Sequence, residues 1–243
     1  MVKYSDLVIC DSKNIESYIH DCYDNKCINC QSPKTTYISY GADIVCSELS
    51  DNSDSYLSWQ NKFGIKNNSY YLIVGRFVPE NNYETIIREY MYCNSKKDLV
   101  IITNANQKLY DKLNKKFHFT DDSRIKFVGT VYDQQLLKKI RENAFAYIHG
   151  HEVGGTNPSL LEALASTNLN LLLDVGFNRE VAEDAALYWN KNEENLSNLI
   201  SMLDNSEIDV STLGKKAKDR IKKHYSWERI AMLYSDILSE NCL

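Results

Sequence analysis

The segment His149–Glu162 (HGHEVGGTNPSLLE) contains the residue types of an anion-binding site. An apolar strand is predicted to end at Gly150, and a loop with two further glycines follows. Asn157 and Pro158 are typical of the first positions of a helix. The N–H groups and dipole of a helix start attract phosphate, and glycines let a ligand approach the backbone closely. The segment therefore predicts a phosphate site beyond the carboxyl end of a parallel strand.

A second loop, 75–82 (GRFVPENN), also follows an apolar strand. Arg76 enters this loop, and a guanidinium at that place is suited to grip a diphosphate bidentately. Asn82 is the predicted cap of the next helix, and Asn81 is a candidate donor to a phosphate or sugar oxygen. The alternative is a surface arginine beside a turn that contains proline. Because both loops follow strands of one predicted sheet, we expect them to converge on one crevice.

Two weaker features accompany these loops. Glu162 lies just over one turn into its helix, where its carboxylate is suited to accept hydrogen bonds from ribose hydroxyls. A solvent-facing glutamate that favours the helix dipole is an equal alternative. Gly129 ends another apolar run, and backbone groups there could hold a nucleobase; a simple strand-terminating glycine is equally compatible with the sequence.

The histidines do not predict a metal site. His149 and His151 flank a glycine and Glu152 follows, but no third and fourth ligands are evident, so we expect neutral, hydrogen-bonding histidines that line the cleft. A second cluster has loose spacing and no downstream ligand pair, which favours free thiols of a reducing compartment over zinc; it comprises His20, Cys22, Cys27 and Cys30. No metal ion or other cofactor is expected.

The elements needed to position the two loops follow from alternating apolar runs and amphipathic stretches. Five continuously apolar runs are predicted as buried parallel strands, at 70–77, 98–103, 125–130, 144–150 and 169–175. Amphipathic helices are predicted between them, notably at 83–92, 133–144 and 158–167. The fold class predicted is α/β, a doubly wound, Rossmann-like parallel sheet over residues 47–225.

The two ends of the chain differ from this pattern. Residues 5–18 predict one βα unit, and residues 35–43 predict one more strand that ends in a glycine turn. Residues 225–238 predict a long amphipathic helix capped by Ser226. We therefore expect residues 1–46 to be the remnant of another domain with its hinge, and residues 226–243 to be a helix that crosses back to it.

Composition excludes several classes of protein. A net charge of -5 argues against a nucleic-acid-binding protein, because no basic excess exists to neutralise phosphates. No signal peptide or membrane-spanning run is evident in the sequence, so a cytoplasmic location is predicted. The absence of a G-x-G-x-x-G segment after any strand argues against a dinucleotide enzyme.

Three segments together resemble retaining glycosyltransferases of family 4, which have the GT-B fold of two facing Rossmann-like domains. They are VGRFVPENNYETIIREY, GGTNPSLLEALA and KKHYSWERIAMLY. More narrowly, VGRFVPENNYE and HGHEVGGTNPSLLEAL are similar to bacterial rhamnosyltransferases that use dTDP-rhamnose to build surface polysaccharides. The resemblance covers only the back, donor-binding part of such an enzyme.

The resemblance implies roles for individual residues. Arg76 would bind the diphosphate and Glu162 the ribose, and these two are the predicted catalytic residues. His151 and Glu152 are possible contacts to the donor sugar. The full predicted donor-binding set is Gly75, Arg76, Asn81, Gly129, Gly154, Gly155, Thr156, Asn157, Pro158, Ser159, Leu160 and Glu162.

The chain departs from the pattern of the family at two of these positions. Asn81 stands where the family usually has a lysine, which removes one positive charge from the diphosphate site. Gly154 stands in place of the first glutamate of an acidic pair, so a contact to the donor sugar changes. The rhamnosyltransferases that the chain resembles share both replacements. This favours a changed preference for the donor sugar over a loss of function.

The implied activity is metal-independent transfer of a sugar, rhamnose from dTDP-rhamnose, to a saccharide or lipid-linked acceptor at the inner membrane face. A GT-B enzyme also needs an acceptor domain, which we expect on a separate polypeptide or in sequence missing from this chain. The alternative is a non-catalytic nucleotide-sugar-binding or regulatory subunit.

Overall fold

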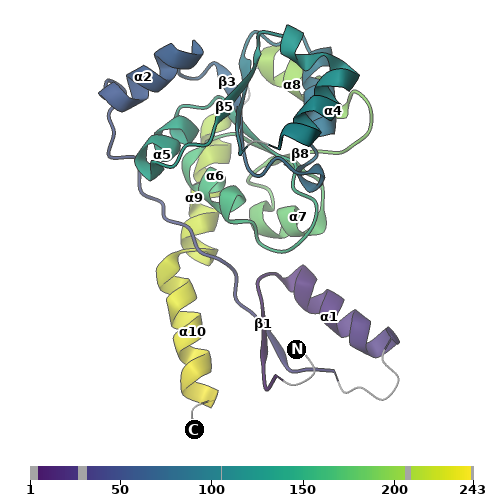
Figure 1. Cartoon of the computed structure of the whole chain (residues 1–243). Helices are drawn as coiled ribbons and strands as arrows, with labels where there is room; N and C mark the ends of the chain where they lie inside the picture. The colour runs from purple at the N-terminus through teal and green to yellow at the C-terminus, as the bar shows by residue number, and fades with distance from the viewer. Residues whose placement is uncertain (1–4, 27–31, 105, 206–208, 242–243) are drawn as a thin grey trace.

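The computed structural model describes residues 5–26, 32–104, 106–205 and 209–241 (Figure 1). Its centre is a six-stranded sheet in the order β5-β4-β3-β6-β7-β8, in which every neighbouring pair is parallel. The strands are β3 (Tyr70–Val74), β4 (Asp98–Ile102), β5 (Ile125–Gly129), β6 (Ala146–His149), β7 (Asn170–Leu173) and β8 (Leu187–Trp189). Two βαβαβ halves therefore meet between β3 and β6, which makes that gap the topological switch point of the sheet.

Helices cover both faces of this sheet (Figure 1). Tyr71 and Ile73 of β3 pack into a cluster with α3 (Tyr83–Tyr92), α4 (Gln107–Phe117) and α8 (Asn195–Asn205). Tyr70 and Leu72 point to the opposite face, where α2 (Asp54–Phe63), α5 (Gln134–Glu142) and α6 (Pro158–Ser166) pack. The same strand is buried on both sides, which explains why its sequence is continuously apolar instead of alternating.

A third apolar cluster joins α6 to α7 (Gly176–Ala182) and α9 (Val210–His224). It packs on the β7 side of the sheet through Leu172. The final helix, α10 (Trp227–Asn241), extends away from the part of the chain that carries the sheet (Figure 1). Its first turn is capped by the Ser226 hydroxyl, which accepts the Arg229 N–H at 3.4 Å, as predicted.

The amino-terminal residues form a separate small unit. β1 (Val8–Cys10) pairs in parallel with β2 (Thr35–Tyr37), and α1 (Lys13–Lys26) connects them. An extended segment then leads to α2 and the large sheet (Figure 1). The unit contacts the larger part through Asp11, whose main-chain oxygen accepts a hydrogen bond from the Thr156 hydroxyl.

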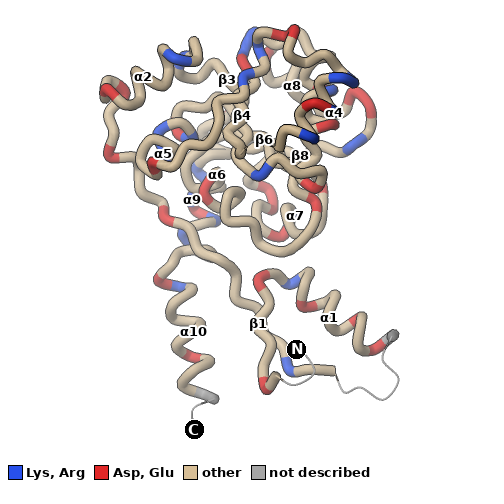
Figure 2. Tube along the Cα trace, viewed as in Figure 1, with Lys and Arg blue, Asp and Glu red and all other residues tan. Residues whose placement is uncertain are grey.

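The sequence prediction of the fold class is confirmed, and all five predicted strands are present. The predicted helices at 83–92, 133–144, 158–167 and 225–238 correspond to α3, α5, α6 and α10. The sixth strand, β8, was not predicted, because the three residues LYW are too short to carry a periodic pattern. None of the helices within the described ranges is both long and apolar enough to cross a bilayer. Basic and acidic residues are interspersed along the described part of the chain in this view (Figure 2).

Candidate functional site

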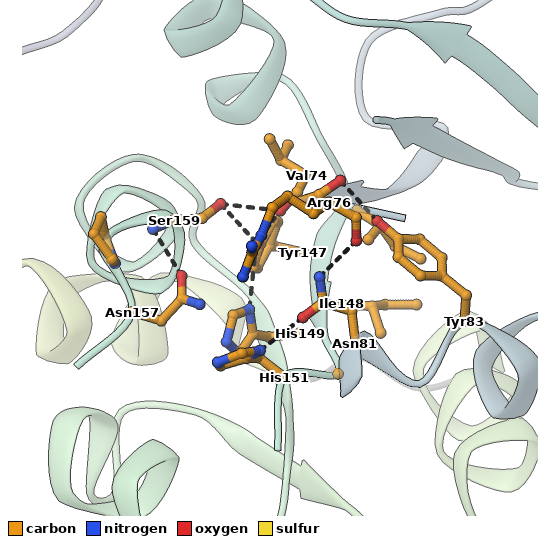
Figure 3. Close-up of a pocket in the computed structure, with 14 residues that line it drawn as sticks. Val74, Arg76, Asn81, Tyr83, Tyr147, Ile148, His149, His151, Asn157 and Ser159 are labelled. Atoms are coloured by element: carbon orange, nitrogen blue, oxygen red, sulfur yellow. Dashed lines mark hydrogen bonds between the residues drawn. The ribbon is translucent and has the colours of Figure 1, made fainter. Parts of the chain in front are cut away.

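A cavity of about 250 Å³ opens at the switch point between β3 and β6. The loop after β3 forms one wall, and the loop after β6 with the start of α6 forms the other (Figure 3). Seven of the predicted donor-binding and sugar-contact residues line it: Gly75, Arg76, Asn81, His151, Asn157, Pro158 and Ser159. The predicted convergence of the two loops is thus confirmed as geometry.

Arg76 supplies the positive charge of this cavity. Its side chain is exposed and reaches across the cavity toward Ser159 and His149 (Figure 3). Its guanidinium makes no ion pair and no hydrogen bond with any residue that the structure describes. An exposed arginine that lacks an acidic partner and faces a helix start leaves its donors available to an anion.

The start of α6 lies opposite Arg76. Asn157 is its cap, as predicted: its Oδ1 accepts the N–H of Ser159 at 2.9 Å and that of Leu160 at 3.4 Å. These two N–H groups are therefore engaged, which differs from the expectation that they stand free for phosphate. The helix dipole still favours an anion at this end, but the Asn157 amide must share or release those donors.

The two loops are tied together by the neighbouring asparagines of the first loop. Asn82 is buried in the left-handed conformation at φ 54°, and its Nδ2 donates to the Gly150 oxygen at 2.8 Å. Asn82 is the N-cap residue of α3, as predicted, but its side chain makes no capping hydrogen bond, because its amide is engaged with Gly150. Asn81 donates to the Arg76 oxygen at 2.7 Å and accepts from His151 Nδ1 at 2.8 Å.

His149 forms the floor of the cavity. The side chain is 5% exposed, and its Nδ1 lies 3.4 Å from the Tyr147 hydroxyl. Burial, and then the neighbouring His151, lower the pKa of His149 to about 3, so its ring is neutral at neutral pH. The buried Nε2 has no hydrogen-bond partner among the described residues. A buried nitrogen without a partner is costly, and a ligand in this cavity is one means of satisfying it.

The glycine-rich loop before α6 faces the amino-terminal unit instead of the cavity. Gly154 has φ 118°, a conformation that favours glycine. A Cβ on Gly155 would lie 1.9 Å from the Asp11 carboxylate, and Thr156 is buried against the same residue. Glu152 forms an ion pair with Lys191. These four predicted residues do not line the cavity of Arg76.

Glu162 lies in a second cavity of about 410 Å³, between α5, α6 and the 40–43 segment. Its Oε2 is 2.6 Å from a guanidinium nitrogen of Arg141, which is almost fully buried and also donates to Ser159 Oγ at 3.3 Å. Glu162 and Arg76 therefore do not share one cavity, but Pro158 lines both. Leu160 is buried in the core.

Gly129 borders a third cavity of about 240 Å³ with Phe77, Tyr110 and Phe127. Its main-chain oxygen accepts the Thr103 N–H at 3.2 Å, so that oxygen already has a partner. The sequence therefore predicted one site for Arg76, Glu162 and Gly129, whereas in the structure each of the three lines a different cavity.

Sequence reasoning predicted Ser159 as a site residue but missed the two tyrosine hydroxyls that shape the cavity of Arg76, those of Tyr147 and Tyr83. Ser159 Oγ donates to the Val74 oxygen at 3.0 Å and lies 3.1 Å from the Tyr147 hydroxyl. The Tyr83 hydroxyl donates to the Gly75 oxygen at 3.0 Å. The available signal was a tyrosine within the apolar run of β6 and another at the first position of α3, because a buried tyrosine hydroxyl needs a hydrogen-bond partner.

The structure describes no group of three or more histidine, cysteine or acidic side chains arranged to hold a metal ion within its described ranges. Of the second candidate cluster, Cys27 and Cys30 lie outside the described residues. His20 instead bonds Ser32 and Thr35. The two cavity histidines lie side by side with ring centroids 6.2 Å apart.

Solved structures share this architecture. HepE from Anabaena in complex with UDP and glucose matches with a TM-score of 0.82 and 17% identity, over 98% of this chain and 64% of that chain. Sucrose-phosphate synthase from Thermosynechococcus elongatus matches with a TM-score of 0.77 and 18% identity, over 98% and 59%. The chain has the fold of GT-B glycosyltransferase structures. It spans less than two thirds of the length of these neighbours.

A glycosyltransferase from Rickettsia africae ESF-5 matches with a TM-score of 0.78 and 13% identity, over 97% of this chain and 63% of that chain. A family model described as a domain of unknown function (DUF1972) matches residues 1–43. That match falls within the predicted amino-terminal segment 1–46. No curated protein sequence matches the chain. The narrower likeness to family 4 and to rhamnosyltransferases stays a prediction.

Proposed function

We propose that this chain binds a nucleotide sugar and is the donor-binding half of a glycosyltransferase. The observation that carries this proposal is the cavity at the switch point, where the guanidinium of Arg76, which has no partner among the described residues, faces the start of α6. Ligands of open α/β sheets bind at this place, and a cation opposite a helix start suits a diphosphate. The complexes of HepE with UDP and with UDP-glucose support a nucleotide sugar as the ligand class.

The chemistry proposed for this cavity is stabilisation of a leaving diphosphate. As the bond between the sugar and the diphosphate breaks, negative charge grows on the departing oxygen. Arg76 and the dipole of α6 are already in place to stabilise that charge, without a metal ion. The unpartnered Nε2 of His149 is suited to bond the donor, and His151 is the proposed contact to the sugar.

The nucleoside is proposed to extend over Pro158 into the cavity of Glu162. There Oε2 pairs with Arg141, whereas Oε1 makes no hydrogen bond within the described chain and is suited to accept a ribose hydroxyl. The other residues predicted to bind the donor are also proposed to contact it. For Gly129 that role is a main-chain contact to the base, and a Gly129→Val variant would test it.

The donor sugar and base are proposed from the sequence resemblance, as rhamnose on dTDP. The acceptor is proposed to be a saccharide or a lipid-linked saccharide, met in the cytoplasm at the inner membrane face. Because the chain covers 64% of the length of HepE, we propose that turnover also needs an acceptor domain, on this or a separate polypeptide. Positioning of the acceptor is a large part of the rate enhancement in such reactions.

Isothermal titration with dTDP, UDP and GDP tests the proposal. At least one nucleotide should bind, and Arg76→Ala should weaken its affinity by about tenfold or more, since a charge-assisted pair is lost. Lys116→Ala is the matched control, because it removes one exposed positive charge, paired with Glu84, that does not line the cavity. Absence of heat with all three nucleotides, or equal affinity of Arg76→Ala and the control, would refute the proposal.

A second candidate is a binding subunit without turnover. Gly154 supplies no carboxylate to the donor sugar, and Glu152 is engaged with Lys191. Adding an acceptor domain and measuring donor consumption separates the candidates. Consumption favours the transferase, and tight nucleotide binding without consumption favours the binding subunit.

A further inference from the structure

A fourth cavity, of about 240 Å³, lies where the amino-terminal unit meets α7, α9 and α10. We call it the junction cavity. Its basic lining residues are Lys13, Arg220 and Arg229, and Glu180 is the acidic one. It shares no lining residue with the cavity of Arg76 or with that of Glu162. The junction cavity is thus separate from the proposed donor site.

Two of its cations have no acidic partner. Lys13 and Arg229 are exposed, and neither forms an ion pair with any residue in the described part of the chain. The ammonium of Lys13 lies 5.9 Å from the centre of the Tyr37 ring, which orients it without neutralising it.

Arg220 is fixed in a different way. It pairs with Glu183 at 2.7 Å and donates to the main-chain oxygens of Val181 at 3.0 Å and Glu180 at 2.8 Å. The junction cavity therefore combines two cations that have no acidic partner among the described residues, Lys13 and Arg229, with the guanidinium of Arg220, which is fixed by hydrogen bonds.

The carboxylate of Glu180 is already bound by α1. It accepts the N–H of Lys13 at 3.0 Å, the N–H of Asn14 at 3.4 Å and the Asn14 side-chain amide at 2.6 Å. It caps the positive end of α1, so the negative charge of Glu180 is largely offset there. The junction cavity keeps a positive balance as a result.

Neutral donors add to this lining. Ser39 is 5% exposed, and its hydroxyl has no hydrogen-bond partner among the residues described. His224 also borders the cavity; burial, and then Arg220, Lys223 and Arg229, lower the pKa of its ring. Two of these cations, Arg220 and Arg229, line the junction cavity.

We propose that the junction cavity binds a phosphate group through Lys13, Arg229 and Arg220. A phosphate offers several strong acceptor oxygens, which suits a lining whose cations come from three different helices better than a single carboxylate does. Because Lys13 belongs to α1 and the arginines to α9 and α10, the bound group joins the amino-terminal unit to the carboxyl-terminal helices. Binding should therefore stabilise their contact.

Titration with inorganic phosphate tests this proposal in the full chain. The Arg76→Ala variant serves as the background, so that phosphate in the donor cavity does not contribute. In it, Lys13→Gln with Arg229→Gln should weaken phosphate binding by about tenfold or more. The main-chain N–H of Lys13 that Glu180 accepts remains in this variant. Circular dichroism checks that it folds.

The matched control is Lys215→Gln with Lys222→Gln, two exposed positions of α9 that do not line the cavity. It removes the same charge and should bind phosphate as the background does. Equal weakening in control and test variants would show a general charge effect and overturn the proposal, as would absence of phosphate binding. Nucleotide titration of the unaltered chain reports on the donor site independently.

Two further probes distinguish the source of the phosphate. Co-sedimentation with phosphatidic-acid vesicles, compared with phosphatidylcholine vesicles, measures binding to a lipid headgroup. Glycerol 3-phosphate measures binding to a soluble monoester. Dependence of either on Lys13 and Arg229 supports the proposed site and identifies the source, whereas vesicle binding that survives the double substitution contradicts a headgroup in the junction cavity.

Discussion

The side-chain amide of Asn82 donates a 2.8 Å hydrogen bond to the main-chain oxygen of Gly150. This bond connects the loop after β3 to the loop after β6, across the gap where the two halves of the sheet meet. A Cβ on Gly150 would lie 2.3 Å from the Asn81 oxygen, so the two backbones touch here. The walls of the Arg76 cavity are therefore fixed to each other before any ligand binds.

Replacement of Asn82 by alanine should lower the free energy of unfolding by about 2 kcal/mol, because the buried Gly150 oxygen loses its donor and alanine is strained at φ 54°. Asn82→Gly loses the same bond but relieves the strain, so it should be more stable than Asn82→Ala by about 1 kcal/mol. Urea denaturation measures both values. Equal stability of the two variants and the unaltered chain would contradict this assignment.

His149 should make stability depend on pH. Its folded pKa is about 3, below the ordinary value of 6.5, so the unfolded chain takes up the proton first as pH falls. The contribution of His149 to the free energy of unfolding is therefore complete above pH 6.5. It is lost as the pH falls from 6.5 to about 3, by up to about 1.4 kcal/mol per pH unit. His149→Gln should flatten this slope in urea denaturations across that range. Parallel curves for variant and unaltered chain would show that His149 is not the group involved.

The sequence predicted the sheet well because its signal is local. Each buried strand is a continuous apolar run, and Asn157 followed by Pro158 marks a helix start by residue type alone. The loops could be assigned to one edge of the sheet because all strands are parallel. Arg76 and the start of α6 were predicted to meet on that basis, and they line one cavity.

The sequence failed where a side chain chooses between partners distant in the chain. Asn82 stands at the cap position of α3, but its amide bonds Gly150. Glu162 stands at the predicted ribose position, but Arg141 from α5 holds one of its oxygens. Periodicity contains no information about such pairings, because they depend on how α5 and the loops pack in three dimensions.

Because Glu162 pairs with Arg141, we expect substitution of Glu162 to lower both nucleotide affinity and the stability of the fold. Arg141 is almost fully buried, so Glu162→Gln should destabilise the chain by about 1–3 kcal/mol, since it leaves a buried cation uncompensated. Adding Arg141→Met should restore most of that stability. If Glu162 also binds ribose, nucleotide affinity in the double variant stays reduced; full recovery of affinity would leave Glu162 with a structural role only.

Gly155 and Asp11 should be coupled across the contact between the amino-terminal unit and the glycine-rich loop. A Cβ on Gly155 would lie 1.9 Å from an Asp11 carboxylate oxygen, so Gly155→Ala forces that side chain to move. We expect a loss of about 1 kcal/mol that is smaller in an Asp11→Ala background, which gives a measurable coupling energy in a double-mutant cycle. Additive effects would indicate that the two segments separate in solution.

Asn81 should control both the state of His151 and the affinity for a diphosphate. Its oxygen accepts from His151 Nδ1 at 2.8 Å, and its nitrogen donates to the Arg76 oxygen. Asn81→Asp keeps the shape, adds a negative charge beside the ring and removes the bond to Arg76. The pKa of His151, which burial now lowers, should rise in this variant, as measured by NMR titration of the ring.

The same charge should repel a diphosphate, so Asn81→Asp should weaken nucleotide binding by about tenfold relative to the unaltered chain. Asn81→Ala is the control, because it removes both hydrogen bonds without adding charge. Its nucleotide affinity should lie between that of Asn81→Asp and that of the unaltered chain. If Asn81→Asp binds nucleotide as tightly as Asn81→Ala, the diphosphate does not approach the first loop. Arg76 would then need another ligand, because its guanidinium opens into the same cavity as the Asn81 side chain.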